Sequence, residues 1–382
     1  MERSQHKTLR QTYGFDDVSL VPGDITINPD QTDISFAIDK LSLSIPILAS
    51  AMDGVVDVRF AIAMGKLGGL AVLNLEGVQT RYNDPGVVLE KIANAPQQEV
   101  TALLQKIYSE PIKDNLVGDR IRAIKKAGVV CAVSLTPANT KKLSPLAIEA
   151  GINVLVVQST VTTARHVSKS YKGLVFSELV KQLPVPVVVG NCVSYSACRK
   201  LMETGIHGVL VGVGPGAACT TREVLGVGVP QATAIMDCAA ARDDYSKASG
   251  RHVPIIADGG MRNGGDICKA FACGADAVML GSVFAQTIEA PGKGNHWGMA
   301  TPHEALPRGT RVKVGVKSSL EQTLFGPTSV TDGTQNLVGA LRTAMGVCGA
   351  RDIKEMHQTE VIIAPSIKTE GKFFQMTQAA CR

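Results

Sequence analysis

A glycine-rich segment around Cys219 holds the residues best suited to covalent chemistry. The segment VGVGPGAACTTREVLGVGVPQ, residues 211–231, places Cys219 beside the hydroxyl groups of Thr220 and Thr221 and the guanidinium of Arg222. Polar and cationic neighbours favour the thiolate form of a cysteine, which is the nucleophile. A lone cysteine is more often a small buried side chain, but the loop setting favours the nucleophile here.

Glycines near Cys219 and in a second segment predict a backbone that can bind cations and anions. Gly212, Gly214 and Gly216 free the loop for unusual backbone angles that expose carbonyl and amide groups. A second segment, IIADGGMRNGGDICKAFACGADAVMLGS, contains Asp258 before a glycine pair and ends in Gly281 and Ser282. Backbone amides next to glycine suit a phosphate, and a carboxylate beside them suits sugar hydroxyl groups. The two segments together therefore suggest a nucleoside monophosphate.

Short apolar runs spaced along the chain must position these loops. Each run is continuous rather than alternating, which is typical of parallel strands covered on both faces. Helical segments that end in a small residue and Gly precede several of them, as in KKAG, EAG, ETG and ACG. Eight such units predict an α/β protein folded as a (β/α)₈ TIM barrel, whose active face lies at the carboxyl ends of the strands. An open doubly wound sheet is the alternative, but no GxGxxG follows the first strand. The predicted strands are residues 46–50, 69–74, 128–135, 152–158, 185–191, 207–212, 253–260 and 275–280.

Composition narrows the class of protein. The 382 residues are 45% hydrophobic and 19% charged, so the chain is not disordered. A net charge of +5 without a block of like sign disfavours a nucleic-acid partner. Nine cysteines without a CxxC pair indicate reduced thiols in a cytoplasmic protein. The start MERSQHKTLR lacks an apolar core, and no apolar run approaches the length of a membrane span, so we expect no membrane partner.

At this point the chain resembles the IMP dehydrogenase and GMP reductase family. The resemblance rests on GPGAACTTR with GVGVPQ, on IADGGMRNGGDICKAFACGADAVMLGS, on YGFDDVSLVPGD and on SAMD at residues 50–53. It extends over about residues 13–300 and implies a barrel enzyme of purine nucleotide metabolism. Such enzymes form homotetramers or dimers of tetramers, and their loop cysteine adds to C2 of the purine.

The resemblance also implies roles for single residues. Cys219 is the implied nucleophile and Thr221 the hydroxyl near the reacting group. Gly214, Gly216 and Cys219 are implied to offer carbonyl groups to a potassium ion. The implied nucleotide-binding residues are Ser50, Met52, Gly298 and Met299 at the purine, Asp258 at the ribose, and Gly260, Gly281 and Ser282 at the phosphate.

The chain also departs from the family pattern. Dehydrogenases of the family carry a pair of CBS modules between the second and third strands, and this chain has room only for helices there. The flap segment ATPHEALPRG lacks their Arg-Tyr pair, and Ala217 replaces a phosphate-loop serine. Gln158 stands where an aspartate is expected, and Asn191 is placed near the nicotinamide. We therefore assign Asn191 and Gln158 to the cofactor. Thr221 with Glu304 is the predicted proton acceptor, with His303 and Arg308 in reserve.

Two reactions fit this resemblance, and the departures favour a CBS-lacking branch related to IMP dehydrogenase. The first is NAD-dependent oxidation of IMP to XMP through a Cys219 thioimidate, supported by K⁺. The second is NADPH-dependent reduction of GMP to IMP and ammonia. A nucleotide-binding regulator without turnover and a flavin-binding barrel are alternatives from other classes.

The sequence also predicts the domain organisation. One catalytic domain, residues 1–382, is expected to carry an amino-terminal extension over about residues 1–40 and no CBS insert. A flap is expected over about residues 292–318 and a tail over about residues 340–382. The spacing of apolar residues predicts a helix over residues 335–345.

Overall fold

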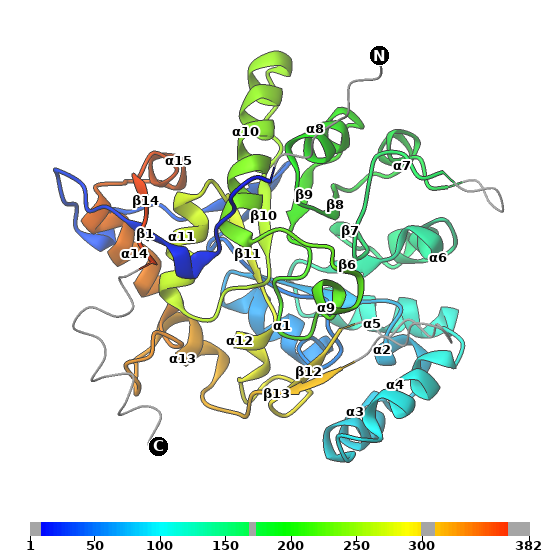
Figure 1. Ribbon diagram of the computed structural model, residues 1–382. Helices are drawn as coiled ribbons and strands as arrows, with labels where there is room; N and C mark the ends of the chain where they lie inside the picture. The colour runs from blue at the N-terminus through cyan, green and yellow to red at the C-terminus, as the bar shows by residue number, and fades with distance from the viewer. Residues whose placement is uncertain (1–8, 168–172, 299–309, 366–382) are drawn as a thin grey trace.

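A closed barrel of eight parallel strands forms the centre of the computed structural model, which describes residues 9–167, 173–298 and 310–365 (Figure 1). The strands follow one another around the barrel in chain order, and the last, β11, pairs with the first, β4. Each lies inside a range predicted from the sequence, except that β8 extends one residue further. The barrel strands are β4 (Ile47–Ala49), β5 (Leu70–Asn74), β6 (Ala132–Leu135), β7 (Val154–Gln158), β8 (Val187–Cys192), β9 (Gly208–Val211), β10 (Ile255–Asp258) and β11 (Ala277–Leu280).

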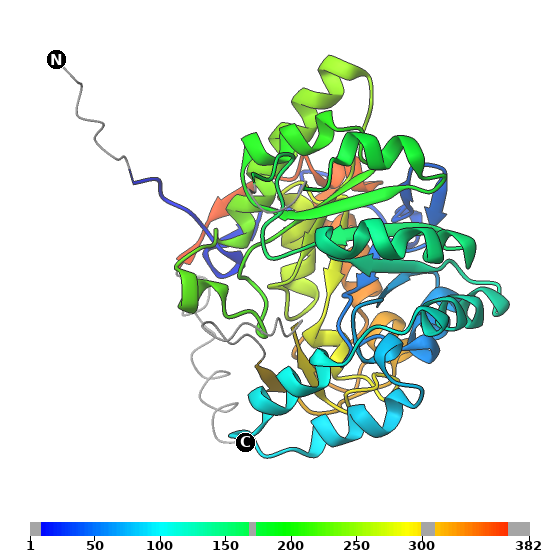
Figure 2. The same cartoon turned by 90° about the vertical axis from the view of Figure 1, so that its right-hand side faces the viewer.

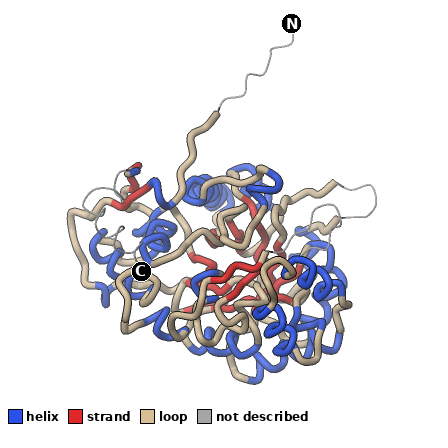
Figure 3. The backbone as a smooth tube through the Cα atoms, turned by 60° about the horizontal axis from the view of Figure 1, so that its bottom comes forward, coloured by secondary structure: helices blue, strands red, loops and turns tan. Residues whose placement is uncertain are grey.

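Helices surround the barrel, and the backbone tube in Figure 3 shows the barrel strands at the centre with helices outside. Gly128, Gly151, Gly205 and Gly274 all adopt positive φ, as predicted for the turns that lead into β6, β7, β9 and β11. The helices are α1 (Val58–Lys66), α2 (Val78–Arg81), α3 (Pro85–Asn94), α4 (Val100–Ser109), α5 (Asp114–Lys126), α6 (Pro137–Glu149), α7 (Phe176–Gln182), α8 (Tyr195–Glu203), α9 (Thr221–Leu225), α10 (Gln231–Ser249), α11 (Gly264–Ala272), α12 (Ser282–Ala285), α13 (Leu320–Phe325), α14 (Leu337–Cys348) and α15 (Ile353–Met356).

The segments outside the barrel form three small sheets. Strands β1 (Val18–Leu20) and β14 (Val361–Ile363) pair antiparallel, so the extension and the tail lie side by side. Strands β12 (Asn295–Trp297) and β13 (Arg311–Lys313) pair at the root of the flap. Two 3₁₀ turns lie in the extension, η1 (Phe15–Asp17) and η2 (Pro29–Gln31).

The third small sheet belongs to the barrel core. Strands β2 (Phe36–Ile38) and β3 (Leu41–Leu43) form a hairpin whose Phe36, Ile38 and Leu43 pack in one cluster with inward-facing strand residues such as Leu70 and Ile256. This hairpin therefore contributes to the core of the barrel.

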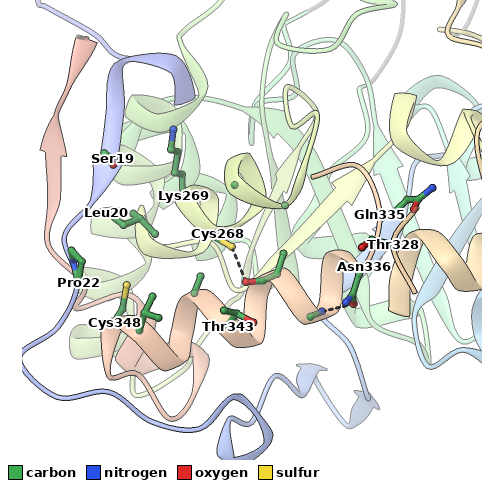
Figure 4. A pocket seen from close by; sticks show the side chains of 16 residues that line it. Ser19, Leu20, Pro22, Cys268, Lys269, Thr328, Gln335, Asn336, Thr343 and Cys348 are labelled. Carbon is green, nitrogen blue, oxygen red and sulfur yellow. Dashed lines mark hydrogen bonds between the residues drawn. The ribbon is translucent and has the colours of Figure 1, made fainter. Parts of the chain in front are cut away.

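Helix α14 packs closely on α11. A Cβ on Gly264 would lie 2.5 Å from the Cβ of Ala340, so only small side chains permit this approach. The same small residues leave a cavity of about 580 Å³ between α11, α14 and β1, across which the Cys268 thiol donates to the Ala340 carbonyl (Figure 4). None of the residues that the sequence assigns to nucleotide chemistry lines this cavity.

We predict that the β2–β3 hairpin stabilises the barrel. Ile38 is fully buried, so Ile38→Ala should lower the free energy of unfolding by about 3 kcal/mol through lost burial and a cavity. The exposed Ser42 of the same hairpin provides the control Ser42→Ala, which should change it by less than about 0.5 kcal/mol. Urea unfolding measures both, and equal values for the two variants would show that the hairpin does not support the core.

Candidate functional site

The predicted site residues within the described part of the chain gather at the carboxyl ends of the barrel strands. Ser50 and Met52 follow β4, Gln158 ends β7, and Asn191 lies at the end of β8. The Cys219 loop follows β9, Asp258 ends β10, and Gly281 follows β11. Parallel strands in a closed barrel bring these ends to one rim, which is where barrel enzymes place their active sites.

The Cys219 thiol, the predicted nucleophile, has a defined partner. The Cys219 Sγ lies 3.2 Å from the Thr221 Oγ1 and donates to it, and the Cys219 backbone amide donates to the Gly216 carbonyl at 3.0 Å. Thr221 is the first residue of α9 and is buried. The loop thus holds the thiol and the hydroxyl of these two predicted site residues together.

The other cysteines in the described residues do not share this setting. None forms a disulfide, and six are buried. Burial raises the pKa of Cys131, Cys268 and Cys273 to about 12, so these thiols keep their protons near neutral pH. Cys219 is partly exposed and lies in the loop after β9, at the carboxyl ends of the barrel strands.

Asp258 and Asn191 form a pair across the mouth. The Asn191 Nδ2 donates to the Asp258 Oδ2 at 2.8 Å. Asn191 stands at an irregularity in the pairing of β8 with β9, where Gly190 pairs with Leu210 and Cys192 with Val211. An extra residue of this kind re-aims a side chain, so the bulge turns Asn191 toward Asp258. Burial raises the pKa of Asp258 to about 6, and the amide hydrogen bond opposes that rise.

Two glutamines complete the floor of the mouth. The Gln158 Oε1 is buried and has no hydrogen-bond partner among the described residues. The Gln231 Nε2 donates to the carbonyls of Val211 and Asp258, and its Oε1 likewise lacks a partner among them. Buried polar atoms are nearly always hydrogen-bonded in proteins, so a ligand or a water molecule is expected to donate to these oxygens.

The loops after β4 and β11 lie against each other. The Ser50 amide donates to the Leu280 carbonyl at 2.9 Å. A Cβ on Gly281 would lie 2.9 Å from the Met52 Sδ and 3.6 Å from the Ser50 Oγ. Ser282 begins α12 without a side-chain cap, and its hydroxyl lies 2.9 Å from the His296 Nε2. The residues predicted to bind the purine and those predicted to bind the phosphate are therefore neighbours.

The loop after β10 meets the Cys219 loop. Gly259 and Gly260 adopt φ of 80° and 83°, and a Cβ on Gly260 would lie 2.9 Å from the Cβ of Pro215. Gly214 also needs its φ of 80°, and a Cβ there would lie 2.8 Å from the Nε of Arg222. Around Gly216 the space is open. Backbone carbonyl oxygens, which this loop contains, are ligands of the kind that a potassium ion takes in proteins.

The flap is described only at its root. Gly298 follows β12, and a Cβ on it would lie 3.7 Å from the carbonyl oxygen of Ala218, the residue before Cys219. The predicted site residues Met299, His303, Glu304 and Arg308 lie outside the described residues.

Several residues at the mouth had no predicted role. At the flap root, Trp297 contacts Tyr108, which contacts Asp53. His296 contacts Ser282, and Gln231 bridges β9 and β10. Asp53 and Gln231 lie inside the motifs quoted above, and Trp297 is the single tryptophan of the chain. Tyr108 lies in a helix of the interval between β5 and β6 and has no local pattern that would mark it.

This fold and site define a (β/α)₈ barrel with a loop cysteine and glycine loops at its active face. Residues 12–382 match the family described as "IMP dehydrogenase / GMP reductase domain", and the chain belongs to this family of oxidoreductases.

Individual relatives agree with that membership. The chain is 40% identical to an "Uncharacterized oxidoreductase" of Mycolicibacterium smegmatis, over 95% of this chain and 99% of the relative. It is 31% identical to the inosine-5'-monophosphate dehydrogenase of Cryptosporidium parvum, over 92% and 91%. The crystal structure of an IMP dehydrogenase/GMP reductase-like protein from Corynebacterium glutamicum superposes with a TM-score of 0.89 at 36% identity, covering 95% of this chain and 97% of that one.

The helices of the described residues were also compared with the requirements of a membrane span. None of them is both long enough and apolar enough to cross a bilayer.

We predict that Asp258→Asn stabilises the fold near neutral pH. The folded-state pKa of about 6 lies above the ordinary value of 3.8, so ionisation destabilises the folded state above about pH 6, and this penalty is absent below about pH 4. The variant should gain at most about 3 kcal/mol at pH 7. Urea unfolding at pH 7 and pH 4 measures the gain, which should vanish at the lower pH. Asp30→Asn, at an exposed position, is the control; an equal gain there, or one independent of pH, would contradict the prediction.

Proposed function

We propose that the chain catalyses the NAD-dependent oxidation of IMP to XMP through a covalent intermediate on Cys219. The observation that carries this proposal is the hydrogen bond between the Cys219 thiol and the Thr221 hydroxyl at the active face of the barrel. A passive nucleotide-binding protein needs no partly exposed thiol paired with a hydroxyl at that position. Family membership supports the reaction class.

Most of the contacts that hold the substrate would lie far from C2, its reacting atom. Asp258 would accept hydrogen bonds from the ribose hydroxyl groups, and Gly260, Gly281 and Ser282 would bind the phosphate. Ser50, Met52, Gly298 and Met299 would line the purine. Fixing both ends of the nucleotide turns attack by the thiol into an effectively intramolecular reaction.

In the first half of the reaction the Cys219 sulfur bonds to C2 of IMP, the thiol proton leaves, and a hydride departs from C2. In the second half water adds to C2, the bond between sulfur and C2 breaks, and XMP leaves. IMP, water and NAD⁺ thus give XMP, NADH and one proton. Thr221 with Glu304 would accept the proton from water, with His303 and Arg308 in reserve.

NAD, when bound, supplies the hydride acceptor. The chain offers Asn191 and Gln158 toward it, and the buried Gln158 Oε1 without a described partner supports a polar ligand at this end of β7. A potassium ion would be bound by the carbonyl groups of Gly214, Gly216 and Cys219 and would hold the Cys219 loop in its reactive shape. We also propose that the protein assembles as a homotetramer or as a dimer of tetramers.

GMP reduction is the second candidate, because the Arg-Tyr pair of the dehydrogenase flap is missing from this chain. Reductases of the family pair a threonine with a flap glutamate, and here Arg308 stands where that glutamate is expected, so the dehydrogenase is ranked first. The two directions use the same thiol, so the product assay decides between them.

We predict that the purified protein reduces NAD in the presence of IMP and that Cys219→Ala lowers this rate at least about 10³-fold. IMP binding by calorimetry should persist, because the ribose and phosphate contacts remain. Cys348→Ala removes the other partly exposed thiol of the described residues and is the matched control with unchanged rate. If the protein oxidises NADPH with GMP but does not reduce NAD with IMP, the reaction is GMP reduction and the ranking of the two candidates is reversed. Full activity of the Cys219 variant would exclude the covalent route.

We also predict a dependence on the monovalent cation. Replacing K⁺ by Li⁺ should lower turnover several-fold while IMP affinity stays the same, because the cation shapes the Cys219 loop rather than the nucleotide contacts. Equal rates in K⁺, Na⁺ and Li⁺ at constant ionic strength would remove the ion from the proposal.

A further inference from the structure

The interval between β5 and α5 contains a pair of helices, α3 and α4, that contacts the root of the flap. In Figures 1 and 2 these helices lie beside β12 and β13, on the side of the barrel away from α10. The Arg311 guanidinium of β13 donates to the carbonyls of Ile92 and Ala93 at 2.7 and 2.9 Å and to the Gln97 Oε1 at 3.2 Å. A cation that binds the last carbonyls of a helix interacts favourably with both the carbonyls and the helix dipole. One strand of the flap root is thereby fixed to α3.

The other strand is fixed to α4 by a buried chain of hydrogen bonds. The Trp297 indole N–H donates to the Tyr108 hydroxyl at 2.9 Å, and that hydroxyl donates to the Asp53 carboxylate. Trp297, Tyr108 and Asp53 are 1%, 4% and 1% exposed. Asp53 also accepts from the Val78 amide at 3.0 Å. An indole only donates and a carboxylate only accepts, so the direction of this chain is fixed and the phenol hydroxyl must do both.

Tyr108 keeps its proton in this position. Burial and the neighbouring Asp53 carboxylate raise its pKa well above the ordinary value of 10.0. A phenylalanine at this position would pack the same ring but would leave the indole N–H buried without a partner and would leave the Asp53 Oδ2 with one donor, the Val78 amide. One Asp53 oxygen already has no partner among the described residues. The hydroxyl group therefore sets the separation between Trp297 and Asp53.

Strand β12 in turn touches both loops assigned to the nucleotide. A Cβ on Gly54 would lie 2.6 Å from the Asn295 carbonyl oxygen, and the Gly292 amide donates to the Gly54 carbonyl at 3.0 Å. Gly54 follows Met52 and Asp53 directly. On the side of the phosphate loop, His296 contacts Ser282 through its Nε2. A shift of β12 would thus move Gly298, His296 and the loop of residues 50–54 together.

We propose that Tyr108 is a positioning residue of the nucleotide site, acting through Trp297 and β12 to hold the purine loop and the flap root in register. It touches neither the nucleotide nor the reacting atoms. The proposal rests on the proposed function, because it assigns Tyr108 to the same site. It gives the helices α3 and α4 a role in that site in addition to their own packing.

The test compares Tyr108→Phe with Tyr82→Phe. The Tyr82 hydroxyl donates to the Ile107 carbonyl at 3.1 Å, so the control removes one hydroxyl from the same group of helices without touching Trp297. Since Trp297 is the single tryptophan of the chain, acrylamide quenching of its fluorescence reports on this position alone. IMP binding by calorimetry and IMP oxidation with NAD are measured on the same samples, well below the melting temperature of each variant.

We expect Tyr108→Phe to raise the quenching constant of Trp297 by about twofold or more, because the indole loses its buried partner. We expect kcat to fall roughly 10-fold, with the KM for IMP changed by less than about threefold, because the remote phosphate and ribose contacts are kept. Tyr82→Phe should resemble the wild type in all three readouts. Unchanged quenching and kcat in Tyr108→Phe, or equal losses in both variants, would overturn the proposal.

Two further results keep the test decisive. If Tyr108→Phe does not fold, Trp297→Phe removes the other end of the same hydrogen bond; it should show the same split between kcat and KM, and an unchanged kcat would overturn the proposal. If the wild type binds IMP but consumes no NAD, the proposed function fails, and quenching together with IMP affinity still decides the role of Tyr108. In that case, quenching and affinity that match the wild type would overturn it.

Discussion

Closure of the barrel between β11 and β4 is the constraint on which the site depends. The pairing of Leu280 with Ala49, continued by the Ser50 amide on the Leu280 carbonyl, brings the two ends of the strand cycle together. This contact makes neighbours of two loops that lie more than 200 residues apart in the chain. An open sheet with the same strands would place the loops after β4 and β11 on opposite edges. The proposed nucleotide site therefore depends on closure of the barrel.

The loops differ in how firmly their own residues hold them. Asp258 is held by Asn191 and Gln231, and the thiol loop is held by a local turn and by Thr221. Among the described residues, β12 and β13 pair only with each other. The position of the flap root comes from contacts with Gly54 and Ser282 and with α3 and α4, which lie in the interval between β5 and β6. Helices α3 and α4 therefore help to position the flap root.

The barrel could be predicted because the patterns that mark its strands and turns are local in the sequence. Continuous apolar runs predicted the strands, and glycines predicted the turns before them, where the structure shows positive φ. The spacing of Leu337, Leu341 and Met345 predicted α14. Site residues inside glycine loops were predicted by the same local cues. The Asn191 bulge was missed because one extra residue in β8 leaves the apolar pattern intact. The bond from Trp297 to Tyr108 joins residues 189 positions apart, and only the folded chain brings them together.

The most direct test of the account is to search for the covalent intermediate itself. Wild-type protein is mixed with IMP and NAD, quenched with acid during turnover, digested and examined by mass spectrometry. The account predicts a purine nucleotide, oxidised by the loss of one hydride, attached to the peptide that contains Cys219. A nucleotide adduct on any other cysteine, or rapid formation of NADH with no adduct on Cys219 at any quench time, would contradict it.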